Sequence, residues 1–179
     1  MAEADESQGI QLGDASVVEQ IKKYKQSTDE GDIRRVRDFL DKLEVKSFAT
    51  PEQFSRSLDR ATKLIARRLP NGRWGAARKF LNLYLRRITY KFYLRRAYEL
   101  NRVEQLLELP MDSYAAKGLK RDYQHRLPRW KGVSHLTPEA SALYQEPAKQ
   151  IAEARSICRV HLNMQYWRAK PMVRKKAKS

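Results

Sequence analysis

The chain has 179 residues, of which 37 are lysine or arginine and 21 are aspartate or glutamate, so its formal net charge is +16. This length suggests one domain with tails. A hydrophobic fraction of 41% supplies enough apolar material for a core, which argues against wholesale disorder. No apolar run approaches the ~18 residues that cross a bilayer. The basic segment of residues 73–98 also lacks a clean apolar face free for lipid, so we expect no membrane partner. The positive charge favours nucleic-acid phosphates instead.

The first 15 residues are predicted to form a flexible acidic tail, and they contain no hydrophobic run of the kind that a secretory signal carries. Cys158 is the only cysteine, which excludes an internal disulfide and indicates a reducing, cytoplasmic (nucleoid-associated) setting. The three histidines, His125, His135 and His161, are scattered without HxxxH spacing. We therefore expect no metal site, and we expect no cofactor.

Helical spacing of apolar residues predicts helices over residues 16–26 and 32–43. The next helix is expected to begin at the sequence TPEQ, with Thr50 as its N-cap and Gln53 at the capping-box position. It is expected to end at the sequence LPNG of residues 69–72, which has the composition of a turn.

The longest predicted helix covers residues 73–98. It holds eight lysines or arginines and no acidic residue, yet it is apolar on most sides, so we expect it to lie in the middle of the domain. Its main apolar stripe consists of Ala77, Leu81, Leu85, Ile88 and Phe92.

Further helices are predicted in the C-terminal half. They cover residues 101–107, residues 113–121 behind an Asp112 or Ser113 cap, a segment beginning at Thr137, and a segment from Pro147 to about residue 166. Residues 168–179 are expected to form a flexible basic tail. The whole pattern predicts an all-α protein with one helical domain over residues 16–167. We expect a compact bundle of six to eight helices around one long central helix, and a helix-hairpin-helix-like element near residues 51–98.

The sequence LPNGRWG joins the two helices of that element. A glycine-containing turn before a helix can present backbone N–H groups to a phosphate, which makes Asn71, Gly72, Arg73 and Gly75 candidate nucleic-acid contacts. An ordinary helix–helix connection is the alternative, because glycine is common in such connections.

Lys79 and Asp112 are the candidate catalytic residues. A lysine amine that is crowded by other cations, here Arg78 and Arg86, can attack a sugar carbon and form a Schiff base. A carboxylate at a helix N-terminus is well placed to accept the proton of that amine. In the alternative, Lys79 is one of 37 basic residues and Asp112 is a routine N-cap.

Aromatic residues lie among the arginines, and their rings can stack on unpaired bases while arginine holds the flanking phosphates. Trp74, in the turn, and Trp130, in a basic loop, are the candidates for exposed rings. The other rings are Tyr84, Tyr90, Phe92, Tyr93 and Tyr98, and we expect most of them to lie in the core.

Two short motifs carry a resemblance to a known family: LPNGRWGAARK at residues 69–79 and LPMDSYAAK at residues 109–117. Together they resemble the helix-hairpin-helix DNA glycosylase superfamily, in which an LPGxG-type hairpin precedes a helix and a PxD segment brings an aspartate to a helix N-terminus. The separation of Lys79 from Asp112 looks most like the archaeal 8-oxoguanine glycosylase branch. The chain is also similar to a bacterial family with the pattern RWGxARKxLN, LPLDSxxAK and RVHLDxxxW.

This resemblance implies a monomeric DNA-binding protein that removes damaged bases, with Lys79 as nucleophile and Asp112 assisting. DNA is favoured over RNA. The residues expected to contact nucleic acid are Asn71, Gly72, Arg73, Trp74, Gly75, Arg78, Arg86, Lys117 and Trp130. Two alternatives stay open: a non-enzymatic nucleic-acid-binding protein that uses the basic face of residues 73–98, and a protein that binds an acidic protein partner.

Overall fold

The computed structural model describes residues 50–123 and 125–169, together with residues 34, 36, 38–40, 42, 43 and 45–48. Every regular element that these residues form is an α-helix or a 3-10 helix, which confirms the predicted all-α class. The predicted acidic tail, the helix over 16–26 and most of the basic tail lie outside the described residues. Within the described part of the chain, we find no helix with both the length and the apolar character needed to cross a bilayer.

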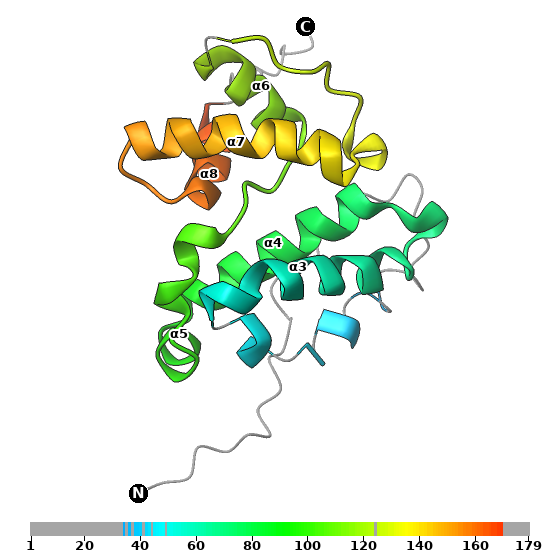
Figure 1. Ribbon diagram of the computed structural model, residues 1–179, viewed down its shortest axis with the longest axis vertical. Helices are drawn as coiled ribbons and strands as arrows, with labels where there is room; N and C mark the ends of the chain where they lie inside the picture. The colour runs from blue at the N-terminus through cyan, green and yellow to red at the C-terminus, as the bar shows by residue number, and fades with distance from the viewer. Residues whose placement is uncertain are drawn as a thin grey trace, which may run out of the picture.

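The α-helices form two layers (Figure 1). One layer contains α3 (Pro51–Ala66), α4 (Trp74–Tyr90) and α5 (Phe92–Ala97), and the other contains α6 (Ser113–Asp122), α7 (Pro138–Ala154) and α8 (Leu162–Arg168). Helices α3 and α4 pack against each other, and α4 contacts α7 across the layers. The connections carry short 3-10 helices: η1 (Val45–Phe48), η2 (Pro70–Gly72), η3 (Leu100–Arg102), η4 (Glu104–Leu106), η5 (Val133–His135) and η6 (Arg159–His161).

Helix α3 begins where the sequence predicts, but without the predicted cap. Pro51 occupies the first turn, where its missing N–H costs nothing. Thr50 is extended, and its side chain makes no capping hydrogen bond. The capping-box prediction is therefore wrong for the Thr50 side chain, and backbone N–H groups of Gln53 and Phe54 donate to the Thr50 carbonyl instead.

Helix α4 is buried on most of its surface, as expected of a central helix. Four members of the predicted stripe are buried, Ala77, Leu81, Leu85 and Ile88. The helix nevertheless ends at Tyr90 rather than continuing to residue 98, because Lys91 adopts an extended backbone. The hydroxyl of Thr89 donates to the Arg86 carbonyl at 2.6 Å, and such side-chain bonds compete with helix continuation. The fifth predicted member, Phe92, is consequently exposed at the start of α5.

Helix α7 corrects a second boundary. Pro147 was predicted to begin a new helix, but it lies buried inside α7, which continues to Ala154. The chain then breaks at Ser156, whose φ of +53° lies in the left-handed region. The helical segment predicted up to residue 166 is therefore interrupted, and α8 is separate from α7.

The buried side chains form two clusters, one for each layer. The first gathers around α3 and α4, with Phe54, Leu81 and Tyr84 among its members. The second gathers around α6, α7 and α8 and includes Tyr144. Trp130 packs against both clusters, so the loop that carries it connects the two layers.

Candidate functional site

The segment between η4 and α6 delivers Asp112 to the centre of the molecule. It has no neighbouring strand among the described residues, and two side-chain amides satisfy its backbone. Asn82 of α4 accepts from the Glu108 N–H at 3.1 Å. Gln145 of α7 accepts from the Leu109 N–H at 3.0 Å and donates to the Leu109 carbonyl at 2.8 Å. The extended path to Asp112 is therefore held from both layers.

Asp112 caps α6, as predicted. Its Oδ1 accepts hydrogen bonds from the backbone N–H groups of Tyr114 and Ala115, each at 2.9 Å. These are two of the four N–H groups that an α-helix leaves without a partner at its start. The cap fixes the carboxylate and leaves its second oxygen, Oδ2, directed toward α4.

Lys79 of α4 meets that oxygen. Its Nζ lies 3.3 Å from Oδ2 of Asp112, and the two side chains are only 14% and 10% exposed. The indole N–H of Trp167, on α8, donates to the same oxygen at 3.0 Å. The two residues that the sequence singled out as a pair, 33 positions apart in the chain, are thus in contact, with α8 supplying a third member.

Such a pair admits two uses. In the first, the nearly buried ion pair is a structural contact. Removing either partner would then destabilise the fold, because the other charge would stay buried without compensation. In the second, the pair is the arrangement in which a proton passes from an ammonium to a carboxylate and leaves a neutral amine as nucleophile. Trp167 and the α6 backbone keep the acceptor in place for that transfer, so Asp112 needs no reorientation.

Arg78 is engaged with the protein's own carboxylates. Its guanidinium forms two hydrogen bonds to Glu108, at 2.7 and 2.9 Å, and a further one to Asp59 at 2.9 Å. It is buried and lies over the ring of Trp74, 5.3 Å from its centroid. Arg78 was expected to hold a phosphate. The structure instead places it in the contact between α3, α4 and the segment that leads to Asp112.

Arg86 lies further along α4, on the side of the helix that faces α8. Its Nη1 donates to the side chain of Asn163 at 2.9 Å, and its buried Nε has no hydrogen-bond partner. Burial lowers the pKa of Arg86, and neighbouring Tyr90 opposes that shift. The predicted phosphate contact therefore lies half-buried between α4 and α8.

The turn residues divide into an exposed and a buried group. Asn71 and Gly72 are exposed and both have positive φ, +56° and +58°. Arg73 and Trp74 are half-buried. Gly75 is buried, and a Cβ there would overlap the Val133 carbonyl oxygen. Its glycine is thus explained by the close approach of η5 to α4.

The other two predicted contacts lie in the second layer. Lys117 is exposed on α6. Trp130 is half-buried, and its ring meets Tyr144 edge to face at 5.7 Å. Trp130 is accordingly a packing residue with one accessible side.

A basic row on α3 was missed by the sequence analysis. It consists of Arg56, Arg60, Lys63 and Arg67, all exposed. Their spacing of four, three and four residues places them on one face of the helix. Because α3 rises 1.5 Å per residue, the row is roughly 17 Å long. This spacing is readable from the sequence, but the apolar stripe on the buried face of the same helix is the stronger pattern.

A group of metal-ligand side chains also escaped the sequence analysis. Ligand atoms of Glu104, Cys158 and His161 lie within 4.8 Å of one another. Two of the three residues already have protein partners: Tyr90 contacts His161 Nδ1 at 2.6 Å, and Arg95 pairs with Glu104 at 2.9 Å. Burial and the charge of Glu104 raise the pKa of the Cys158 thiol. We interpret Glu104 and His161 as members of a polar network of protein side chains that also includes Tyr90 and Arg95.

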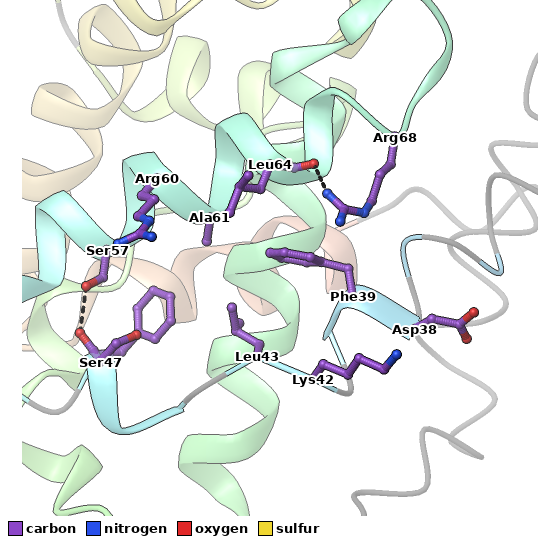
Figure 2. Close-up of a pocket in the computed structure, with 11 residues that line it drawn as sticks. Asp38, Phe39, Lys42, Leu43, Ser47, Ser57, Arg60, Ala61, Leu64 and Arg68 are labelled. Carbon is purple, nitrogen blue, oxygen red and sulfur yellow. Dashed lines mark hydrogen bonds between the residues drawn. The ribbon is translucent and has the colours of Figure 1, made fainter.

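A cavity of about 560 Å³ lies between α3 and the segment before it. Figure 2 shows Phe39 and Leu43 facing Ala61 and Leu64 across it, with Arg60 and Arg68 at the α3 side. Its lining does not include the Lys79–Asp112 pair.

No protein-family model, no curated protein and no solved structure matches this chain.

Proposed function

We propose that the protein binds DNA and excises damaged bases, with Lys79 as the nucleophile. The observation that carries this proposal is the 3.3 Å contact between Lys79 Nζ and Asp112 Oδ2, inside a chain of net charge +16. An interior lysine beside the aspartate that caps α6 supplies a nucleophile and its proton acceptor in one place. The motif resemblance to helix-hairpin-helix glycosylases assigns the same two residues.

The proposed chemistry begins with proton transfer from the Lys79 ammonium to Asp112. The neutral amine then attacks C1′ of the target nucleotide, and the glycosidic bond breaks. The departing base keeps the electron pair of that bond and takes up the proton that Asp112 received, while the bonded nitrogen gives one of its protons to the ring oxygen. Opening of the sugar ring gives a protonated imine between Lys79 and C1′, the species that borohydride reduces. Because Lys79 is only 14% exposed, this scheme requires the target nucleotide to leave the duplex and enter beside α4 and α6.

The phosphate contacts are proposed mainly on exposed cations, and Lys117 on α6 is one of them. Arg73, at the start of α4 beside Asn71 and Gly72, is half-buried and is proposed as a further contact from the turn. The row on α3 adds four further cations. Arg78 is left out of this set, because Glu108 and Asp59 already occupy its guanidinium. Gly75 is left out because it is buried.

Borohydride trapping tests the chemistry. Duplexes that carry 8-oxoguanine, uracil or an abasic site are incubated with wild type, Lys79→Gln, Asp112→Asn and the control Lys149→Gln. Lys149 is a solvent-exposed lysine that also faces a carboxylate, Glu153 at 3.9 Å. We expect a covalent adduct with wild type and Lys149→Gln, a weaker one with Asp112→Asn, and none with Lys79→Gln. Absence of any adduct or base loss with wild type would remove the enzymatic proposal.

A second candidate function is nucleic-acid binding without catalysis. The row on α3 favours it, since these exposed cations are independent of the Lys79–Asp112 pair. In this case Lys79→Gln keeps full DNA affinity, while replacing the four cations of the row by glutamine weakens binding and flattens its salt dependence. Each lost phosphate contact lowers the log–log slope by about 0.9. Failure of the wild type to bind duplex DNA at ~100 mM salt would favour an acidic protein partner instead.

A further inference from the structure

Three aromatic rings at the junction of α4 and α5 face solvent. Tyr90, Phe92 and Tyr93 are 53%, 68% and 84% exposed. Most of these rings were predicted to lie in the core. Phe92 and Tyr93 leave it because the helix breaks at Lys91, and Tyr90 is the last residue of α4 before that break. Large apolar rings that gather on a surface generally mark a binding site.

The three rings contact a neighbouring histidine or one another. Tyr90 stacks on the ring of His161 with centroids 5.9 Å apart and an interplanar angle of 23°, and its hydroxyl contacts His161 Nδ1 at 2.6 Å. Phe92 and Tyr93 meet edge to face at 5.6 Å. His161 therefore anchors Tyr90, while Phe92 and Tyr93 contact each other and offer their remaining faces and edges to solvent.

The charge around the rings selects the kind of partner. Lys91 and Arg96 are exposed beside Phe92 and Tyr93, and residues 73–98 contain no acidic residue. An anionic partner with flat apolar faces fits this surface. Unpaired bases on a phosphate backbone have that chemistry, because every base can stack on an aromatic ring while cations hold the phosphates. In a paired duplex the base faces are stacked on one another inside the helix. A duplex would therefore contact the cations of this surface, Lys91 and Arg96, but not stack on its rings.

We propose that Phe92 and Tyr93, with Lys91 and Arg96, form a binding surface for single-stranded DNA. The choice of DNA rests on the proposed function; the stacking itself does not depend on Lys79. Helix α5 lies at the end of the molecule opposite α6 (Figure 1), so this surface is separate from the Lys79–Asp112 pair. It holds an unpaired strand away from the site of chemistry.

Fluorescence anisotropy with a labelled oligo-dT strand and with a duplex of equal length tests this surface. The full-length variants are Phe92→Ala, Tyr93→Ala, their double variant and Tyr93→Phe. Matched controls are Leu143→Ala and Met164→Ala, which shorten exposed apolar side chains on α7 and α8. Circular dichroism checks that each variant keeps its helices.

We expect each alanine variant to weaken single-strand binding by roughly 5-fold or more, and the double variant by up to about 100-fold. Tyr93→Phe and both controls stay within about 2-fold of wild type, as does duplex binding by every variant. Equal losses on strand and duplex, or no loss on either, would overturn the proposal. Tighter binding of an oligo-U RNA than of oligo-dT would overturn the choice of DNA. A wild-type dimer that dissociates in the double variant would assign the surface to a second copy of the chain.

This result is separable from the chemistry. If oligo-dT binding depends on the rings while no adduct forms on any damaged duplex, the surface stands and the excision proposal fails. If adducts form and the alanine variants bind oligo-dT as tightly as wild type, the excision proposal stands and the proposal of a single-strand surface is wrong.

Discussion

Trp167 donates its indole N–H to the same oxygen of Asp112 that Lys79 approaches, across 55 residues of chain. The ring also packs against Tyr114, with centroids 4.8 Å apart, beside the Asp112 cap. Trp167 therefore positions the carboxylate from α8 without being the group that reacts. Its removal tests whether the geometry of the pair matters for the proposed chemistry.

We expect Trp167→Phe to keep the packing on Tyr114 and lose the hydrogen bond to Asp112. A bond to a charged group contributes about 1.5–3 kcal/mol, so the free energy of unfolding in urea should fall by about that amount. Single-turnover trapping should slow while duplex affinity stays unchanged. Trp130→Phe is the control, because Trp130 lies away from the pair in the contact between the layers. Equal slowing in both variants would assign the effect to stability alone.

Arg78 is predicted to be structural. Lysine cannot reproduce its two-pronged contact with Glu108 while also reaching Asp59. We expect Arg78→Lys to lower the free energy of unfolding by about 1–3 kcal/mol, because lysine keeps the charge but leaves buried carboxylate oxygens without their hydrogen bonds. Arg102→Lys, in the exposed pair with Glu99, should change it by less than about 1 kcal/mol. A stable Arg78→Lys protein with reduced DNA affinity would return Arg78 to the phosphate contacts.

Gly75 is predicted to serve packing rather than phosphate binding. An alanine Cβ there would overlap the Val133 carbonyl and lie 2.6 Å from Leu136 Cβ. Since backbone atoms of η5 cannot rotate away, we expect Gly75→Ala to cost about 3 kcal/mol in thermal or urea unfolding. Gly72→Ala, where a Cβ meets open space but φ is +58°, should cost about 1 kcal/mol. A Gly75→Ala protein that kept its melting temperature but lost duplex affinity would support the phosphate role instead.

Asp122 is predicted to contribute a pH-dependent part of the stability. Burial alone would raise the pKa of Asp122, but hydrogen bonds from Arg121 and Arg155 outweigh it, so the pKa is lowered below 3.8. A lowered folded-state pKa stabilises the protein at all pH values above the unfolded-state pKa. That stabilisation is lost as the pH falls through the folded-state value.

We therefore expect Asp122→Asn to lower the free energy of unfolding by about 1–3 kcal/mol at pH 7. The gap to wild type should close as the pH falls below about 3.8. Urea titrations at a series of pH values measure this gap. Glu99→Gln, in an exposed pair with Arg102, serves as the control and should show almost no gap at either end. A gap for Asp122→Asn that widened toward acid would contradict the assignment.

The sequence predicts elements better than contacts. The Asp112 cap follows from local chemistry, since Pro110 forces an extended lead-in and aspartate is a preferred N-cap. Contact of Asp112 with Lys79 depends on how α4, α6 and α8 pack, and periodicity does not encode that packing. The hydrogen bond from Trp167 to Asp112 cannot be predicted from the sequence for the same reason.

The wrong predictions also have local causes. Apolar periodicity continued past Tyr90, so Phe92 was placed in a stripe that the break at Lys91 moves to the surface. Pro147 was taken as a helix start because proline favours that position. Its ring is instead accommodated within α7, in a buried setting where tertiary packing outweighs the lost hydrogen bond.

The amides of Asn82 and Gln145 have one more consequence. Each acts on the backbone before Asp112, and Gln145 both donates and accepts. A carboxylate side chain of the same size has no proton to donate near neutral pH, so glutamate cannot replace Gln145 in this role. Amides also do not titrate. These amide contacts between the two layers and the segment before Asp112 therefore carry no charge that a change of acidity could alter.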